Sequence, residues 1–386
     1  MKYEIKQNHY IVAGHSFTIE ADEMILNMMS EYEPFRGEGK KEDVFKMTIK
    51  TSSPNLNTKM IVDSQWELDN TSSICGHTSD GHFFFKYQWQ HKPIVCLITD
   101  QQYTKGTAYL TGYEPTLAIN MAMMVLYSHA TAHLMTTIIH TSAIAYKQHA
   151  YLFIGLSGTG KSTHSQLWLS NINDTSLIND DKPVIRIYEN GEIMLYGSPW
   201  SGKLKCYRNV SYPVGAIVKL KQAPYNKISI LNKIEAYVAL LHCIYGKRWD
   251  KSIADALHNI ECTLVDTLPI YQLECLPDKE AALLCKETIT ENNLGNMRLK
   301  KGYVLRDISG DKVIVGEGLE AVDFSSLLSF NETAAWLWKK AEEMGDFTPE
   351  LLSEAICKEY EVSPETAYHD TVKIINRWME EGLIKD

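Results

Sequence analysis

One eight-residue stretch constrains the fold of this chain more than any other feature. Residues 155–162, Gly-Leu-Ser-Gly-Thr-Gly-Lys-Ser, match the phosphate-loop pattern G-x-x-x-x-G-K-[ST] at every fixed position. The apolar run Tyr151-Leu-Phe-Ile154 comes directly before it, and residues 163–169 carry apolar side chains at helical spacing after it. This order of strand, loop and helix is what the pattern requires. It predicts an α/β domain and disfavours a mere glycine-rich turn with an exposed lysine.

The residue types of the loop fit the phosphates of a nucleotide. Glycines allow backbone N–H groups to wrap the anions, Lys161 adds a positive charge, and Ser162 offers a hydroxyl group to Mg²⁺. The helix expected to begin near Lys161 points its positive end at the same phosphates. The sequence therefore predicts a nucleotide-binding site here.

The chain is too long for one ordinary compact domain. Its 386 residues suggest two or three domains, and a content of 45% hydrophobic and 22% charged residues is ordinary for a soluble globular protein. The N-terminus lacks the features of a signal peptide, and no run of about 18 apolar residues occurs. These observations predict a cytoplasmic protein without membrane segments. Eight scattered cysteines, without a CxxC pair or zinc-like spacing, predict reduced thiols.

Negative charge is concentrated toward the C-terminus. The net charge is −10, and residues 297–386 hold 11 Lys and Arg against 18 Asp and Glu, a net charge of −7. An acidic module of this kind is a poor match for a phosphate backbone. We therefore expect no nucleic-acid partner. The oligomeric state, a homo-oligomer included, stays open at this stage.

Side-chain periodicity divides the first 290 residues in two. Residues 1–113 read as β-rich, because short runs such as 45–50 alternate apolar and polar side chains. Apolar residues then recur at helical spacing over 114–139, behind Pro115, which predicts a long buried helix. Residues 114–290 as a whole mix strands and helices around the phosphate loop, which predicts a mixed α/β nucleotide-binding domain.

A third region follows the polar, glycine-containing stretch 291–296, which we interpret as a domain boundary. Apolar runs on either side of a turn within 302–315 predict a hairpin. Residues 297–386 are therefore predicted to form a small α+β domain. Its hairpin should be followed by three helices, and each has its own start signal: Asn331, Thr348-Pro349 and Ser363-Pro364.

Two adjacent acids and one histidine could act together with the loop. Asp180 and Asp181 end a predicted strand nineteen residues after Lys161, where open α/β sheets place ligand sites. One carboxylate can hold the divalent ion that bridges nucleotide phosphates, and the other can take the proton of a hydroxyl group being phosphorylated. An acidic turn exposed to water is the alternative. His140 should lie beside the loop if its segment and strand 151–154 are neighbours, which suits either a ligand role or a structural one.

These motifs resemble those of a known family. Residues 153–163 are similar to the phosphate loop of phosphoenolpyruvate (PEP) carboxykinases, residues 177–181 to their double-aspartate motif, and His140-Thr-Ser-Ala143 to their His-Cys-Ser-Ala segment. HPr kinase/phosphorylase and its relatives share this order of motifs. The resemblance implies a PEP carboxykinase-like fold and an ATP-dependent kinase. Two features depart from it: Lys182-Pro183 replace the usual Glu-His of carboxykinases, and the glutamate-bearing second signature of HPr kinases is not visible.

The resemblance also implies roles for single residues. Lys161 would contact the transferred phosphate, and Asp181 would be the general base. Ser162 and Asp180 would contact Mg²⁺, and His140 would be a metal or phosphate ligand. The residues that would hold ATP are Gly155, Leu156, Ser157, Gly158, Thr159, Gly160, Lys161, Ser162 and Thr163.

A basic stretch later in the same domain offers candidates for binding the acceptor. Gly197-Ser-Pro-Trp-Ser-Gly-Lys203 occupies a region where an acceptor-facing loop would lie, which makes Lys203 and Arg208 candidates for substrate binding. Exposed basic residues in a loop are more often simply solvated, so both interpretations stay open.

The last ninety residues resemble a second family, the PqqD-like modules. These small winged-helix-like modules bind the leader peptides of ribosomally made, modified peptides, as an extra strand beside a short sheet and against the third helix. A DNA-reading winged helix is the rival interpretation, which the acidic charge disfavours. The similar segments are Gly302-Tyr-Val-Leu-Arg-Asp307, Ala321-Val-Asp-Phe324, Phe330-Asn-Glu-Thr-Ala-Ala-Trp-Leu-Trp338 and Glu381-Gly-Leu-Ile384.

Together these features predict a kinase whose C-terminal domain, residues 297–386, recruits a precursor peptide and presents one of its hydroxyl groups to ATP and Mg²⁺. One alternative is a small-molecule kinase, acting for example on free serine, with a regulatory C-terminal domain. Another is a non-catalytic, ATP-gated carrier of leader peptides. The intact Lys161, Ser162, Asp180 and Asp181 disfavour the carrier, because a degenerate site would be expected to lose some of them.

Overall fold

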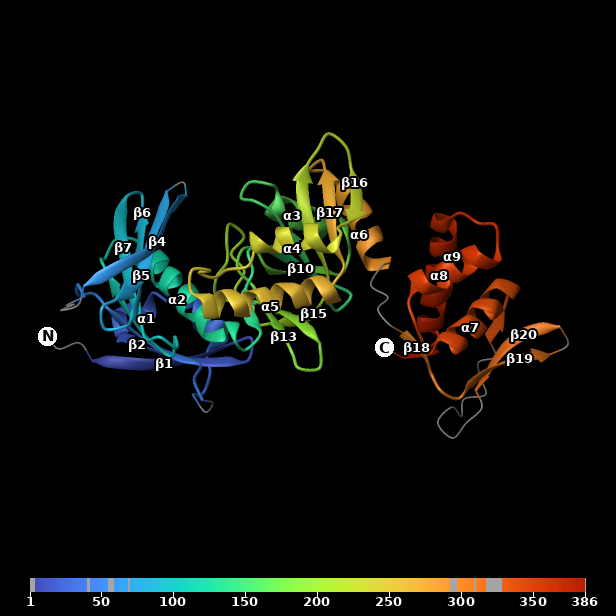
Figure 1. Cartoon of the computed structure of the whole chain (residues 1–386), viewed down its shortest axis with the longest axis horizontal. Helices are drawn as coiled ribbons and strands as arrows, with labels where there is room; N and C mark the ends of the chain where they lie inside the picture. The colour runs from blue at the N-terminus through green and yellow to red at the C-terminus, as the bar shows by residue number, and fades with distance from the viewer. Residues whose placement is uncertain are drawn as a thin grey trace. The chain divides into compact units, whose positions relative to one another are not determined.

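The protein divides into two compact units, Met1–Lys286 and Glu287–Asp386 (Figure 1). Each unit has its own hydrophobic core, and the two cores share no residue. The mixed α/β architecture expected from the sequence is confirmed. The structure is a computed structural model, and it describes residues 4–39, 42–54, 59–68, 70–291, 297–308, 310–316 and 328–385.

Residues 5–291 form two large sheets and the helices that cover them. In chain order the elements are β1 (Ile5–Val12), β2 (His15–Asp22), α1 (Glu23–Asn27), the 3-10 helix η1 (Ser30–Phe35), β3 (Phe45–Lys50), β4 (Met60–Leu68), β5 (Thr71–Thr78), β6 (Phe83–Trp89), β7 (Lys92–Thr99), β8 (Lys105–Leu110), α2 (Pro115–Ala132), β9 (Thr136–Ile138), β10 (Ser142–Tyr146), β11 (His149–Ile154), α3 (Lys161–Asn171), β12 (Thr175–Asn179), β13 (Val184–Ile187), β14 (Ile193–Tyr196), β15 (Ser211–Gln222), β16 (Lys227–Ile230), α4 (Lys233–Leu241), α5 (Lys251–Thr267), β17 (Ile270–Cys275) and α6 (Lys279–Glu291).

The first sheet has the strand order β1-β2-β3-β8-β7-β6-β5-β4. In β3, Phe45, Met47 and Ile49 are buried and alternate with more exposed residues, as the period-two pattern predicted. The β-rich character of the N-terminal region is thereby confirmed. α2 packs against β7 and β8 of this sheet and also against β9 of the second sheet. One buried helix therefore joins the two sheets.

The predicted helix over 114–139 is correct only in its first part. α2 begins at Pro115, as expected, but ends at Ala132, and the chain continues as β9. Met135 has a positive φ of 51°, which is incompatible with a continuing helix. The residues of β9, Thr136-Thr-Ile138, are β-branched and buried, which favours a strand. A buried strand and a buried helix carry the same apolar signal over a few residues, so periodicity alone merged them.

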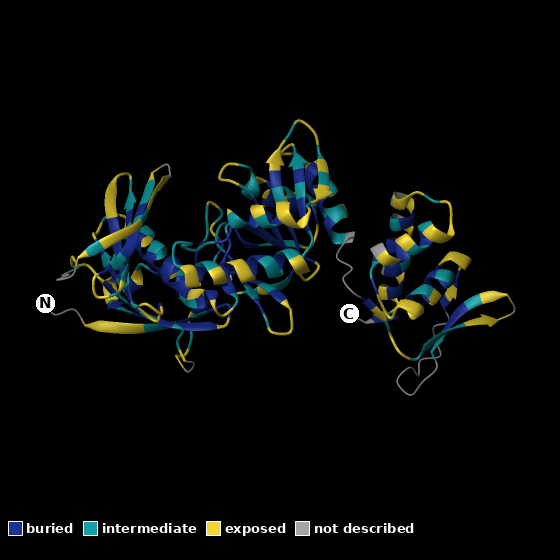
Figure 2. Cartoon of the chain, viewed as in Figure 1, coloured by how far each residue is buried: buried dark blue, intermediate teal, exposed yellow. Residues whose placement is uncertain are grey.

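The second sheet carries the phosphate loop. Its strand order is β12-β10-β11-β15-β14-β13-β9, and β17 pairs with β15 and β16 outside that path. β11, β15 and β17 are parallel, so their carboxyl ends lie at one edge of the sheet. β10 is antiparallel to both β11 and β12, which brings its first residue to the same edge. α5 turns a buried stripe that includes Ile253, Leu257 and Leu264 toward the core and an exposed face outward (Figure 2).

The second unit packs three helices on short antiparallel strands. The sheets have the orders β19-β20-β21 and β22-β18-β23, and the core includes Trp338 and Trp378, whose rings meet edge to face at 5.3 Å. The winged-helix-like arrangement stays a prediction. The elements are β18 (Met297–Leu299), β19 (Tyr303–Ile308), β20 (Asp311–Gly316), β21 (Leu328–Phe330), α7 (Glu332–Met344), β22 (Asp346–Phe347), α8 (Pro349–Glu359), α9 (Pro364–Glu380) and β23 (Ile384–Lys385).

All three helix starts predicted for this unit are confirmed. The side chain of Asn331 accepts a hydrogen bond from the first turn of α7, Thr348 does so for α8, and Ser363 for α9. The predicted hairpin is confirmed as β19 and β20. Within the part of the chain that the structure describes, no helix is long and apolar enough to cross a membrane. Residues 292–296 of the expected boundary and the Ala321-Val-Asp-Phe324 segment lie outside the described residues.

Candidate active site

The phosphate loop between β11 and α3 depends on its glycines. The φ angle is 152° at Gly155, 82° at Gly158 and 102° at Gly160, values that side chains with a Cβ rarely allow. A Cβ on Gly155 would also lie only 2.7 Å from the hydroxyl oxygen of Thr159. The sequence pattern thus forms a tight, glycine-dependent turn from the end of a buried strand into a helix.

Lys161 begins α3 and bends back over the loop. Its Nζ donates to the carbonyl oxygen of Gly155 at 2.9 Å and to that of Leu156 at 3.2 Å. Burial lowers the pKa of this ammonium group, and the Lys182 charge lowers it further, while Asp181 acts in the opposite direction. An ammonium held by loop carbonyls can exchange them for the stronger, charged oxygens of a phosphate.

A cavity of about 590 Å³ opens beside the loop, a size typical of small-molecule sites. The loop and the first turns of α3 form one wall. Gln222, at the end of β15, donates from Nε2 to the carbonyl oxygen of Gly158 at 3.3 Å and so ties the second wall to the loop. Apolar walls next to a phosphate loop fit the base of a nucleotide. The apolar lining side chains are Leu167, Leu220, Ala223, Cys275, Leu276 and Pro277.

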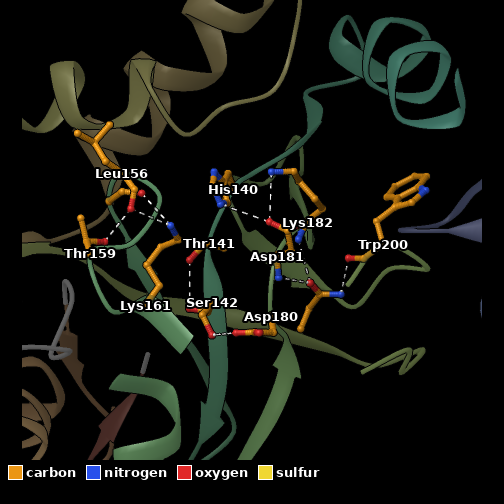
Figure 3. A network of polar contacts seen from close by, with 12 residues as sticks. His140, Thr141, Ser142, Leu156, Thr159, Lys161, Asp180, Asp181, Lys182 and Trp200 are labelled. Atoms are coloured by element: carbon orange, nitrogen blue, oxygen red, sulfur yellow. Dashed lines mark hydrogen bonds and ion pairs between the residues drawn. The ribbon is translucent and has the colours of Figure 1, made fainter. Parts of the chain in front are cut away.

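A buried chain of hydrogen bonds ties Asp180 to α3. Ser142 Oγ, at the start of β10, donates to Asp180 Oδ1 at 2.7 Å (Figure 3). Ser165 Oγ, on α3, lies 2.6 Å from Ser142 Oγ. Because the Ser142 proton goes to the carboxylate, Ser165 is the donor in the second bond. All three side chains are buried, so the orientation of Asp180 is set relative to the helix that follows the phosphate loop.

Asn179 shapes the turn that carries the two aspartates. Its Oδ1 accepts hydrogen bonds from the backbone N–H groups of Asp181 at 2.9 Å and Lys182 at 3.0 Å. Its Nδ2 donates to the carbonyl oxygen of Trp200 at 3.1 Å. The side chain is fully buried, and this Asx-type turn ends β12. The positions of both carboxylates therefore depend on one amide side chain.

Asp181 lies between two basic side chains (Figure 3). His140 Nε2 and Lys182 Nζ each lie 3.3 Å from Asp181 Oδ1. Burial, together with the Lys182 ammonium, lowers the pKa of His140 to about 4. The imidazole is therefore neutral near pH 7, so its contact with the carboxylate is not an ion pair at that pH. The backbone N–H of Thr141 also donates to the carbonyl oxygen of Asp181 at 3.0 Å, which joins the two segments.

The structure brings the site residues expected from the sequence to one edge of the second sheet. The loop from Gly155 to Thr163 follows β11, and Asp180 and Asp181 follow β12. His140 precedes β10, the strand between those two. In Figure 3 the segment that begins at His140 lies between the loop with Lys161 and the aspartates. The three segments that carry them are therefore neighbours along this edge.

Oxygen ligands suited to Mg²⁺ are present at this edge. Asp180 Oδ1 accepts from Ser142, and Oδ2 accepts from the backbone N–H of Leu204 at 3.1 Å, so each oxygen keeps lone pairs for an ion. Ser162 adds a hydroxyl group at the start of α3. Among the described residues, no group of three or more His, Cys, Asp or Glu side chains could hold a metal by itself. The donors fit an ion that completes its shell with water and phosphate oxygens, as Mg²⁺ does.

The second unit has a small groove of its own between β21 and α9. Its cavity measures about 110 Å³, and the rings of Phe330 and Trp378 stack there at 5.9 Å. β21 ends the order β19-β20-β21, so no strand of the described residues pairs with its outer edge. An unpaired edge beside an apolar groove can accept an added strand. The lining residues are Phe330, Asn331, Ala334, Ile374, Arg377 and Trp378.

Sequence reasoning assigned no role to Ser142, Ser165 or Asn179. Ser142 and Asn179 lie inside the two segments that resemble carboxykinase motifs, and both are polar residues within apolar strand segments, which is a signal for a buried polar contact. Ser165 has no distinguishing signal in its helix. Lys182 appeared in the sequence only as a departure from a motif, although the structure places its ammonium on Asp181.

Comparison with known families identifies the end of the chain. Residues 315–384 match the family described as Coenzyme PQQ synthesis protein D (PqqD). The chain thus carries a PqqD domain at its C-terminus, as its sequence motifs predicted. No curated protein matches the chain.

Two solved structures are similar to portions of the chain. TbiB1 in complex with the TbiA(beta) leader peptide is 19% identical, with 23% of this chain and 94% of that chain covered and a TM-score of 0.20. The Hpr(Ser) kinase/phosphatase from Coxiella burnetii is 14% identical, with 40% of this chain and 88% of that chain covered and a TM-score of 0.23. Neither TM-score is high enough to indicate a shared fold.

Proposed function

We propose that this protein transfers the terminal phosphoryl group of ATP to a hydroxyl group of a peptide that its C-terminal unit recruits. The observation that carries the proposal is the buried hydrogen-bond chain from Ser165 through Ser142 to Asp180. It fixes a carboxylate against the phosphate-loop helix, which is the arrangement that phosphoryl transfer needs and that a simple phosphate-binding turn does not.

In this proposal the residues of the first unit divide the work. The loop from Gly155 to Thr163 binds the phosphates, and Lys161 contacts the phosphoryl group that moves. Asp180 and Ser162 would hold Mg²⁺, which when bound supplies neutralising charge for the phosphates. The adjacent cavity accepts the base of the nucleotide, since its far wall is apolar.

Asp181 is the proposed general base. His140 and Lys182 both contact its Oδ1, which leaves Oδ2 to accept the proton of the acceptor hydroxyl group. The hydroxyl oxygen then bonds to the terminal phosphorus, the bond from that phosphorus to the bridging oxygen breaks, and ADP leaves. His140, neutral near pH 7, orients the carboxylate through its contact with Oδ1. It adds no positive charge of its own.

The PqqD domain supports a peptide as the acceptor. A leader segment would add a strand to the outer edge of β21 and pack on α9, with an apolar side chain in the groove beside Phe330 and Trp378. A recruited leader keeps the rest of the peptide at high local concentration, so the site of transfer need not bind it tightly. This chemistry belongs to the biosynthesis of modified peptides.

The test uses the full-length protein, ATP, Mg²⁺ and a precursor peptide encoded by a short reading frame beside the gene. Mass spectrometry should find a peptide that has gained one phosphoryl group. Asp181→Asn should reduce this transfer at least ~10²-fold while nucleotide binding persists, because only the proton acceptor is lost. Asp174→Asn, at an exposed acid before β12, is the matched control and should retain activity. A peptide that binds but is never phosphorylated by the unaltered protein would contradict the proposal.

A further inference from the structure

The loop between β14 and β15 is positively charged and lies next to Asp180 and Asp181. Residues 197–208, Gly-Ser-Pro-Trp-Ser-Gly-Lys-Leu-Lys-Cys-Tyr-Arg, include three cations and no acid. Lys203 and Lys205 are exposed. A loop that holds only positively charged residues, next to two carboxylates, would be unusual if it served only to connect two strands.

Internal contacts hold this loop in one conformation. Trp200 is buried, and its indole N–H donates to the Tyr32 hydroxyl at 2.8 Å. Ser201 Oγ donates to the carbonyl oxygen of Leu204 at 2.7 Å and accepts from the backbone N–H of Cys206 at 3.1 Å. The lysines at 203 and 205 are therefore presented from a structured turn.

The turn lies directly against both aspartates. The backbone N–H of Leu204 donates to Asp180 Oδ2 at 3.1 Å. A Cβ added to Gly202 would lie 2.8 Å from the carbonyl oxygen of Asp180 and 3.2 Å from the Cβ of Asp181. Lys203 thus follows a glycine that packs closely against Asp180 and Asp181, and Lys205 follows the residue that bonds to Asp180.

The two ammonium groups at 203 and 205 have no counter-ion within the described residues. The other basic side chains near the turn are already engaged. Lys182 pairs with Asp181, and Arg208 Nη1 donates to the carbonyl oxygen of Leu177 at 2.6 Å. The nucleotide cavity takes no lining residue from this loop, so its charge is not directed at the nucleotide base.

Resting on the proposed function, we propose that Lys203 and Lys205 bind a carboxylate group of the acceptor peptide close to the hydroxyl group that is phosphorylated. The site would thus select an acceptor of the anionic class. The carboxylate can come from an acidic side chain beside the hydroxyl residue or from the free C-terminus of the peptide. Electrostatic attraction at exposed lysines would favour such acceptors and would weaken with salt.

The test compares short synthetic peptides with the full-length protein, ATP and Mg²⁺. One series has serine flanked by two Glu, two Gln or two Lys residues, with both ends blocked. A second series ends in serine, as a free acid or as an amide. We expect kcat/KM for the Glu peptide to exceed that for the Lys peptide roughly tenfold, or the free acid to exceed the amide by a similar factor. The first preference identifies a side-chain carboxylate and the second a terminal one.

Charge reversal at the turn is the decisive comparison. Lys203→Glu combined with Lys205→Glu should abolish or invert the preference and leave KM for ATP unchanged. Lys50→Glu combined with Lys105→Glu makes the same change in net charge at exposed positions of the first sheet, and it should keep the preference. The inference would be overturned if the preference for acidic peptides survived charge reversal at 203 and 205. It would also be overturned if the reversal raised KM for ATP and left the preference in place.

Failure of the kinase proposal itself would look different. Versions of the same peptides with alanine in place of serine can be tested for binding by fluorescence anisotropy, in the presence of a non-hydrolysable ATP analogue. If no peptide is phosphorylated but binding still follows charge, the kinase proposal fails and the anionic site stands. If binding ignores charge in the unaltered protein, the site at Lys203 and Lys205 is refuted whatever the activity.

Discussion

Asp180 depends on a hydroxyl group that lies 38 residues away in the sequence. Ser142→Ala removes the proton that its carboxylate accepts and leaves Ser165 without its acceptor. We expect a loss of about 1–2 kcal/mol in the free energy of unfolding and a fall in turnover of about tenfold, because the carboxylate is free to rotate. Urea unfolding and steady-state kinetics measure the two effects. Ser170 is an exposed serine of α3, the helix that carries Ser165, and Ser170→Ala should change neither quantity.

His129 makes stability depend on pH. It is buried in α2, its Nδ1 donates to the carbonyl oxygen of Val125, and burial lowers its pKa to about 4. Unfolding restores a pKa near 6.5, so the unfolded chain binds the proton first as pH falls. The free energy of unfolding therefore has its full value above pH 6.5 and falls as pH drops from 6.5 to 4. From pH 7 to pH 5 the loss should be about 2 kcal/mol.

Urea unfolding of the first unit at several pH values tests this prediction. His164, whose pKa burial also lowers to about 4, should contribute in the same direction. His129→Gln should therefore reduce the slope of stability against pH without removing it. An unchanged slope in that variant would show that His129 takes up no proton on unfolding in this range.

At the scale of elements, local signals predicted more than long-range contacts. Adjacent residues specify the strand, loop and helix around Lys161, and they also specify the helix caps at Asn331 and Ser363. The structure contains all of these features. The contact between Ser165 and Ser142 was not predictable. It requires β10 to pair with both β11 and β12, and nothing in the sequence of either serine specifies that pairing. The roles of the site residues stay predictions.

The helix caps of the second unit offer a test of local stability. Ser363 Oγ accepts from the backbone N–H of Thr366 at 3.2 Å at the start of α9. Ser363→Ala should cost the second unit about 1 kcal/mol and leave the first unit unchanged, because the two cores share no residue. Ser363→Asp keeps a capping acceptor and should be nearly neutral. Thermal unfolding monitored for each unit reads out the difference. Equal effects of the two substitutions would argue against a capping role.

At the scale of the whole molecule, removal of residues 297–386 separates the proposed function from the small-molecule alternative. The first unit keeps its complete core in the shortened protein. A peptide kinase should then show a KM for the leader-bearing peptide that is roughly 10²-fold higher, with kcat largely retained, because recruitment is lost and chemistry is not. Initial rates over a range of peptide concentrations measure this. Turnover of free serine that the shortened protein retains would favour a small-molecule kinase for which the C-terminal domain is regulatory.

The separate cores also matter for how such a protein can evolve. A substitution that alters the groove between β21 and α9 need not disturb the packing around Asp180, since no core residue is common to both units. Under the proposed function, the choice of peptide and the chemistry performed on it are inherited as two exchangeable parts. Replacement of the last hundred residues by another module of the same kind would redirect the enzyme to a new precursor without redesign of its reaction centre.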